Sequence, residues 1–305
     1  MDVADDDAAA GAARRERKIE CLKRGSPNQL PDHPLLVARQ APAHKRLVAV
    51  LFDMNLRAVH QERAARLGKE LFLYERAFAD CLDRIALLRR RFGRALLVGC
   101  PDPQWPSRLV EISDDVSVRD PGSLFAAAFN GQIIVEDYWE PAASTYDLVL
   151  AVGTLDSVND LPLALRLIRH SMGDDALFIG ALSGGDTLPA LRSAMRAADL
   201  ATGAAAPHVH PRVEPSALAP LLGDAGFHRQ VVDIDRVSVS YPSLDRLVGD
   251  LRAMGATNSL LARPRFIRKQ DRAASAQAFA DLGTGSRTVE TFEILHFAAW
   301  TTGKD

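Results

Sequence analysis

Short apolar runs recur along the chain, and segments with helical spacing separate them. The runs stand at 95–98, 116–118, 133–135, 146–152 and 176–182. The run at 146–152 is apolar throughout after Asp147, which is typical of a strand buried at the centre of a sheet. Between the runs, apolar residues recur three and four positions apart, as on one face of a helix. The pattern therefore predicts repeated strand–helix units and a mostly parallel sheet with helices on both faces.

The pattern changes beyond residue 210, where helical and extended segments alternate less regularly. Helical spacing is found at 215–222, 244–254 and 270–282, and extended segments at 231–234, 237–239 and 289–301. The last segment is a long apolar strand with no helix after it, so we expect it to insert antiparallel to its neighbours. The expected fold class is α/β, a doubly wound, seven-stranded, mostly parallel sheet of Rossmann-like type with helical cap insertions.

The start of the chain lacks this periodicity. Residues 1–46 run from an Ala- and Asp-rich stretch through a basic cluster to several prolines, so we expect a flexible leader. The basic cluster is either part of a solvated tail or a contact with RNA or an acidic partner. A single domain is expected over 47–305, with a helical opening segment at 47–92 and cap elements at about 186–212 and 243–282.

Composition narrows the class of protein. The 305 residues are 47% hydrophobic and 25% charged, and a formal net charge of −2 favours neither nucleic acid nor an anionic membrane as partner. The three cysteines form neither a CxxC pair nor a disulfide framework, which favours a reducing, cytoplasmic location. No apolar run approaches the ~20 residues that span a bilayer. The first residues are acidic and lack an apolar core, so we expect no secretory signal.

The loop after the first predicted strand is the first candidate for ligand binding, because open α/β sheets bind ligands beyond the carboxyl ends of their strands. Gly99 allows a sharp turn there, yet Cys100-Pro101-Asp102-Pro103 stands where a nucleotide-binding loop carries more glycines. Proline has no N–H to donate. The position therefore suits a ligand loop, while its set of backbone donors is reduced.

Acidic side chains end the second and third predicted strands. Asp120 either accepts hydrogen bonds from ribose hydroxyls or serves as the N-cap of the next helix, with Pro121 at the first helical position. Asp137 and Tyr138 follow the third strand, and they either flank an adenine ring or belong to the polar rim of the sheet. Both pairs of alternatives stay open from the local pattern.

Several blocks of sequence resemble the class I S-adenosylmethionine-dependent methyltransferases. The resemblance is narrower to the branch that holds the biotin-synthesis malonyl-carrier-protein methyltransferase and a mitochondrial complex I assembly factor with a methyltransferase fold. It covers about residues 50–301 and is most specific across 146–258. The blocks are Phe52-Asp53 with Leu56 and Arg57, Tyr146–Leu150, Val158–Pro162, Leu177–Leu188, Leu221–Phe227, Tyr241–Leu244 and Asp250–Asn258.

The resemblance implies a site for S-adenosylmethionine at the ends of the first four strands. By position, Gly99 lies against the cofactor's amino-acid portion with Cys100 beside it, and Asp120 lies at the ribose. Asp137 and Tyr138 would flank the adenine. The floor of the site would be Val152-Gly153. Pro101 and Pro103 depart from the family's glycine-rich loop, which puts cofactor binding in question.

Four polar residues are candidates for contact with a substrate on the helical roof: Asp186, His208, Tyr241 and Asn258. Each has the alternative interpretation of a helix cap, a loop residue or a satisfied polar group of the core. His208 also forms an HxH pair with His210, but two histidines without a third ligand make a weak metal site, so no metal is expected.

The function expected from the resemblance is S-adenosylmethionine-dependent methyl transfer to an acceptor that the sequence does not identify, with a protein among the candidates. The alternative is a degenerate, non-catalytic or hydroxylase-type assembly factor that holds a protein client, such as a subunit of respiratory complex I. Asp120 and Asp137 favour the enzyme, whereas the loop at 99–103 favours the alternative. Methyl transfer depends on in-line approach and exclusion of water more than on acid–base groups, so no catalytic residue is named.

Overall fold

A computed structural model describes residues 50–302 apart from 69–70, 204 and 265–267, with only the backbone described at 201–202. The expected leader over 1–46 lies outside the described residues. The division into a leader, a single domain and cap elements therefore stays a prediction.

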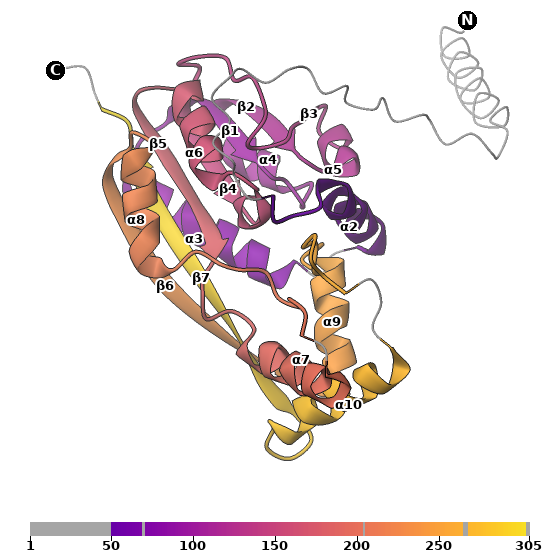
Figure 1. The fold of residues 1–305 in the computed structure, drawn as a ribbon. Helices are drawn as coiled ribbons and strands as arrows, with labels where there is room; N and C mark the ends of the chain where they lie inside the picture. The colour runs from indigo at the N-terminus through magenta and orange to yellow at the C-terminus, as the bar shows by residue number, and fades with distance from the viewer. Residues whose placement is uncertain (1–49, 69–70, 204, 265–267, 303–305) are drawn as a thin grey trace, which may run out of the picture. The chain divides into compact units, whose positions relative to one another are not determined.

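The described part is built on a seven-stranded sheet with the order β3-β2-β1-β4-β5-β7-β6 (Figure 1). Strands β1 to β5 are parallel to one another, and β7 is antiparallel to both β5 and β6. The predicted fold class and the antiparallel insertion of the last strand are confirmed. The strands are β1 (Phe92–Val98), β2 (Ser113–Asp120), β3 (Gln132–Ile133), β4 (Tyr146–Val152), β5 (Met172–Ser183), β6 (His228–Tyr241) and β7 (Thr288–Trp300).

Helices cover both faces of this sheet. The helices are α2 (Met54–Leu67), α3 (Phe72–Leu87), α4 (Trp105–Val110), α5 (Ser123–Ala127), α6 (Leu161–Ser171), α7 (Pro189–Thr202), α8 (Pro215–Asp224), α9 (Leu244–Ala253) and α10 (Lys269–Asp281), with a short 3-10 helix η1 at Leu155–Ser157. Alternate residues of a strand point to opposite faces, so Leu97 packs in one hydrophobic cluster with α3, α7 and α9. Leu96 packs in the other with α6 and α8.

The central strand confirms the interpretation of the longest apolar run. β4 lies in the middle of the sheet, between β1 and β5, and its residues from Leu148 onward are buried. An apolar run without polar alternation is what burial on both faces requires.

The weaker strands differ from the expectation. β3 has two residues instead of the expected 133–135, because the Val135 carbonyl turns away and accepts the Tyr138 N–H at 2.8 Å. β6 is one continuous strand where two pieces were expected, and it pairs with β7 along its length. In both places pairing with neighbours, which local sequence does not reveal, decides the strand limits.

The start of α7 corrects another expectation. Asp160 caps α6 as predicted, since its Oδ1 accepts the Leu163 N–H at 2.9 Å. Neither Asp186 nor Thr187 caps α7, because the helix begins at Pro189 after Leu188 in a left-handed conformation. Instead, the buried carboxylate of Glu290 on β7 accepts the N–H groups of Ala190 and Leu191 at 3.1 and 2.8 Å.

Candidate functional site

The carboxyl ends of β1 and β2 are joined through one carboxylate. The Asp120 Oδ2 accepts the Cys100 N–H at 2.6 Å, and its Oδ1 accepts the Gly122 N–H at 2.6 Å. Gly99 has a φ of +81°, and a Cβ there would lie 2.8 Å from the Cβ of Thr154. The structure therefore brings Gly99, Cys100 and Asp120 together, with glycine required at the turn.

The environment of Asp120 separates its two interpretations. Gly122, not Asp120, is the N-cap of α5, so the N-cap interpretation is wrong. The side chain is 2% exposed, and this burial raises the pKa of its carboxyl to about 6 against the effect of the two N–H donors. A contact with a ribose stays a prediction.

A buried ion pair fills the space beside these strand ends. The guanidinium of Arg57, on α2, donates to both carboxylate oxygens of Glu136, at 2.8 and 2.5 Å, and to the carbonyl of Thr154 at 2.7 Å. The Thr154 hydroxyl donates to the same carboxylate. The side chains of Arg57 and Glu136 are 4% and 1% exposed. This arrangement satisfies the hydrogen bonds of both buried charges, as such a pair requires.

An aromatic ring lies against the carboxyl end of β4. The ring of Tyr74, on α3, lies against Gly153, where a Cβ would come within 2.6 Å of its Cε1. Val152 beside it is buried. The two cavities lined by Gly153 measure about 40 and 50 Å³. Sites for small molecules usually have about 300–1,000 Å³, so side chains of α2 and α3 occupy the strand edge in the described arrangement.

Asp137 and Tyr138, the residues expected to flank an adenine, have other partners than Asp120. Asp137 accepts the Asp160 N–H at 2.8 Å through Oδ2, next to the start of α6. Burial raises the pKa of its carboxyl. Tyr138 is 66% exposed. The expected role of these two residues at an adenine stays a prediction.

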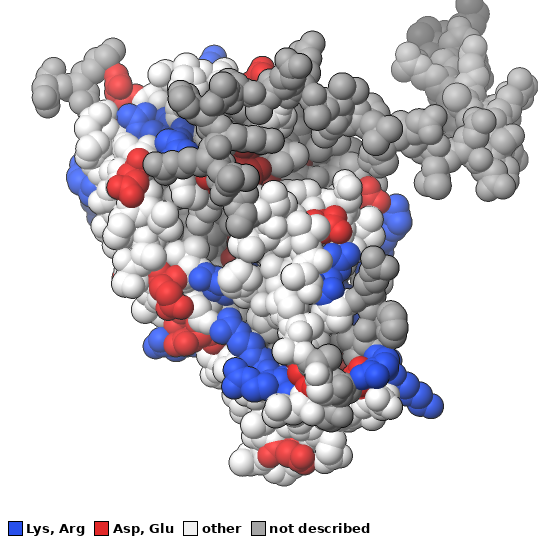
Figure 2. All heavy atoms as spheres, in the orientation of Figure 1, with Lys and Arg blue, Asp and Glu red and all other residues white. Residues whose placement is uncertain are grey.

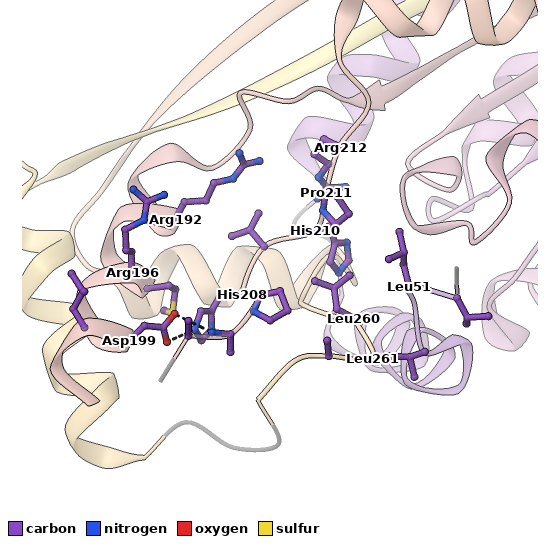
Figure 3. A pocket seen from close by; sticks show the side chains of 18 of the residues that line it. Leu51, Arg192, Arg196, Asp199, His208, His210, Pro211, Arg212, Leu260 and Leu261 are labelled. Carbon is purple, nitrogen blue, oxygen red and sulfur yellow. Dashed lines mark hydrogen bonds and ion pairs between the residues drawn. The ribbon is translucent and has the colours of Figure 1, made fainter. Parts of the chain in front are cut away.

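Two larger cavities lie on the side of α7 and α9, where Figure 2 shows Lys and Arg side chains at the surface. One measures about 1,060 Å³ and lies between α7, the segment 205–212 and Leu260–Ala262 (Figure 3). The other measures about 390 Å³ and is lined by α7, α9 and the segment 256–258. Arg212 lines both of these cavities and also the 50 Å³ cavity at Gly153.

The four substrate candidates separate into two groups. His208 and Asn258 both line the 390 Å³ cavity. The ring Nε2 of His208 lies 2.9 Å from an oxygen of Asp199 (Figure 3), and Asn258 donates to the Pro207 carbonyl at 2.8 Å. Tyr241 is buried in the core, where burial and then the charge of Asp250 raise its pKa. Asp186 is exposed and pairs with Arg236 at 3.4 Å.

The two histidines of the HxH pair have different partners. His210 is buried and its Nε2 accepts the Ser259 N–H at 2.9 Å. Burial, followed by the charge of Arg212, lowers the pKa of His210 to about 3. Within the described ranges no group of three or more His, Cys, Asp or Glu side chains is placed to hold a metal ion. No described helix is long and apolar enough to cross a membrane.

Sequence reasoning missed the residues that dominate this region: Arg57, Glu136, Thr154 and Arg212. Arg57 stands in one of the blocks that resemble the methyltransferases, and Glu136 ends the third strand, so a signal existed for each. Their pairing joins positions 79 residues apart, which local pattern does not reveal.

No protein-family model matches the chain. The chain is 31% identical to the mitochondrial arginine-hydroxylase NDUFAF5 of Danio rerio, over 82% of this chain and 82% of that protein. It is 29% identical to a malonyl-[acyl-carrier protein] O-methyltransferase of Xylella fastidiosa, over 53% of this chain and 59% of that protein.

Solved structures give a weaker likeness. The N-methyltransferase NodS from Bradyrhizobium japonicum, in complex with S-adenosyl-L-homocysteine, aligns with a TM-score of 0.44 at 12% identity, over 80% of this chain and 98% of that chain. The fold assignment rests on the strand order, and the family on the sequence relatives. The chain belongs to the class I S-adenosylmethionine-dependent methyltransferase-like family that includes the arginine-hydroxylase NDUFAF5.

Proposed function

We propose that this chain is an S-adenosylmethionine-dependent methyltransferase. Its cofactor site would lie at the carboxyl ends of β1, β2 and β4, a region we call the strand edge, which α2 and α3 close in this structure. The observation that carries the proposal is the convergence of Gly99, Cys100 and Asp120 at the strand ends of a methyltransferase-type sheet. A related protein is named a malonyl-[acyl-carrier protein] O-methyltransferase, which supports the same reaction class.

The strand-end groups fit such a cofactor in their chemistry. The turn at Gly99 requires glycine because Thr154 fills the space that a Cβ would take, and each oxygen of Asp120 accepts one N–H in the structure. A carboxylate offers about four lone-pair sites, so two remain for hydroxyl groups of a ribose. When bound, the cofactor would supply an electrophilic methyl group on a sulfonium.

Side chains of α2 and α3 fill the space beside Gly153 and Thr154 at the ends of the strands. Arg57 and the Tyr74 ring occupy the edge, and cavities of about 40 and 50 Å³ remain there. Binding therefore requires α2 to withdraw the Arg57 guanidinium from Glu136. An acceptor would then approach from the larger cavities, because Arg212 lines these as well as the small cavity at Gly153. His208 and Asn258 are proposed to contact that acceptor.

A second candidate is a non-catalytic or hydroxylase-type assembly factor that holds a protein client. Two observations favour it: Pro101 and Pro103 offer no N–H to a cofactor, and the Arg57–Glu136 pair is fully buried. A relative that aligns with 82% of this chain is named an arginine-hydroxylase. In this case the methyltransferase cofactor never enters the strand edge.

Titration calorimetry of the full chain with S-adenosylmethionine and S-adenosylhomocysteine tests the two candidates. The enzyme requires saturable binding of both, weakened at least about tenfold by Asp120→Asn, the loss of one charge-assisted hydrogen bond. Asp115→Asn is the matched control, since Asp115 is exposed on the same strand. Absence of binding at millimolar ligand would contradict the methyltransferase proposal and favour the assembly factor.

A further inference from the structure

Arg212 is a buried cation with an incomplete set of partners. Its side chain is 6% exposed, and its nearest carboxylate oxygen, on Asp156, is 3.5 Å from Nη1. That Asp156 oxygen already accepts the Ser183 N–H. Among the described residues the buried Nε of Arg212 has no hydrogen-bond partner. Burial of a guanidinium is unfavourable unless its donors are satisfied, so this side chain is prepared for a further acceptor.

The cavity beside Arg212 is lined by further arginines. The lining of the 390 Å³ cavity includes four arginines and, within the described ranges, no carboxylate. Burial lowers the pKa of two of its histidines, His60 and His210, so the positive charge comes from the arginines. Arg63 and Arg252 are exposed in this lining, whereas Arg263 pairs with Asp53 at 3.3 Å. Arg192 of α7 lines the adjoining cavity (Figure 3) and adds a like charge near Arg212.

The same cavity has an apolar wall. Leu188, Leu191 and Leu251 line it and are 3%, 7% and 6% exposed. The Asp156 carboxylate lies near Arg212 on the side of the 50 Å³ cavity, whereas Asp199 and Glu214 line the larger cavity, where Asp199 lies against His208. A cationic end and an apolar wall within one cavity suit a molecule that carries both a negative charge and a short hydrocarbon portion.

We propose that the cavity around Arg212 binds a small organic anion, with its carboxylate or phosphate group on the Arg212 guanidinium and its hydrocarbon portion on the leucine wall. The planar guanidinium matches either oxyanion with two parallel hydrogen bonds. The exposed Arg63 and Arg252 draw the anion toward the cavity by long-range attraction. The cavity is the one proposed above for the acceptor, but the anion site holds whether or not the ends of the strands take a cofactor.

Titration calorimetry of the full chain with four probes of equal chain length tests the proposal. Octanoate and octyl phosphate bind saturably, and the tighter of the two identifies the preferred headgroup. Octylamine and 1-octanol do not bind, because one carries the wrong charge and the other carries none. Inorganic phosphate alone binds more weakly than octyl phosphate, since it has no contact with the leucine wall.

Variants place the anion in this cavity. Arg212→Gln weakens octanoate binding at least about tenfold, as expected for loss of a charge-assisted pair. Arg229→Gln, at a side chain 65% exposed, is the matched control and leaves the affinity unchanged. Should Arg212→Gln fail to fold, Val209→Trp provides a second variant, because Val209 lines the cavity and a larger side chain excludes the probe. Asp120→Asn leaves octanoate binding unchanged, which separates this site from the cofactor edge.

Three results would overturn the proposal. The first is absence of octanoate and octyl phosphate binding at millimolar concentration. The second is octylamine binding as tightly as octanoate. The third is unchanged octanoate affinity in both Arg212→Gln and Val209→Trp.

Discussion

The protonation of Asp120, at the carboxyl end of β2, makes the stability of the protein depend on pH. Its folded pKa is about 6, whereas an aspartate in an unfolded chain has a pKa of about 3.9. The unfolded chain therefore loses its proton first as the pH rises. The free energy of unfolding contributed by Asp120 falls between about pH 4 and pH 6, by about 3 kcal/mol in total. The facing groups are the N–H donors of Cys100 and Gly122, with Glu136 and Arg57.

We expect Asp120→Asn to remove this slope from the pH dependence of unfolding by urea. The variant is also less stable near pH 4 by about 1–3 kcal/mol, because an amide accepts only one of the two backbone N–H donors. Asp115→Asn, exposed on the same strand, keeps the slope of the unmodified chain. A slope that survives in Asp120→Asn would show that another group titrates there.

The Arg57–Glu136 pair supplies a second prediction for single residues. Arg57→Met leaves the Glu136 carboxylate buried without its cation, which lowers the free energy of unfolding by about 3–5 kcal/mol. The double variant Arg57→Met with Glu136→Leu recovers most of that loss, because no uncompensated charge remains. Arg91→Met is the control: its pair with Asp114 is exposed, so the cost is below about 1 kcal/mol. A double variant as unstable as the single one contradicts the interpretation.

At the scale of helices and strands, apolar periodicity predicted the elements that are buried on both sides. β4 was predictable because it is a long apolar run that has little choice of environment, and β7 because apolar residues predominate between Phe292 and Trp300. β3 was not, since it lies at the edge of the sheet and its length depends on the turn at Val135. Glu290 caps α7 through the N–H groups of Ala190 and Leu191, which lie 100 and 99 residues before it in the sequence. Local sequence does not predict such a contact.

The candidate site divides in the same way. Gly99 and Asp120 follow predicted strands, so their meeting at one edge was predictable from the parallel topology. The closure of that edge by Arg57 and Tyr74 was not predictable. Both side chains come from helices that precede the sheet in the sequence. The position of each side chain depends on how its helix packs against the sheet.

The cap of α7 gives a prediction at this scale. Glu290→Ala removes the acceptor of the Ala190 and Leu191 N–H groups, and we expect a loss of about 1–3 kcal/mol in the free energy of unfolding. Hydrogen exchange at these two amides should accelerate. Asp186→Ala is the matched control, because the exposed Asp186 makes no capping bond to α7, and it should change stability by less than about 0.5 kcal/mol. The reverse order of the two effects would restore Asp186 as the cap.

Across the described molecule, α2 is attached to the sheet domain through the segment that precedes it. Asn159, after η1, accepts the N–H groups of Leu51 and Phe52 at 2.9 Å each. The Asp53 N–H donates to the Ser259 carbonyl at 2.8 Å, and the Asp53 carboxylate pairs with Arg263. Residues distant in sequence thus hold the helix that places Arg57 at the strand edge. Release of these contacts would free α2 to withdraw Arg57 from Glu136, as the proposed enzyme requires.

Asn159→Ala tests whether this attachment controls access to the strand edge. Loss of the two hydrogen bonds lowers the free energy of unfolding by about 1–3 kcal/mol and accelerates hydrogen exchange in α2. If the cofactor binds only when Arg57 has withdrawn, the apparent dissociation constant is the intrinsic one divided by the open fraction. A larger open fraction then tightens S-adenosylhomocysteine binding several-fold, although the protein is less stable. Asn130→Gly, at an exposed left-handed turn residue with φ +51°, leaves exchange in α2 and the affinity unchanged. Faster exchange in α2 without tighter binding would mean that α2 does not control the edge.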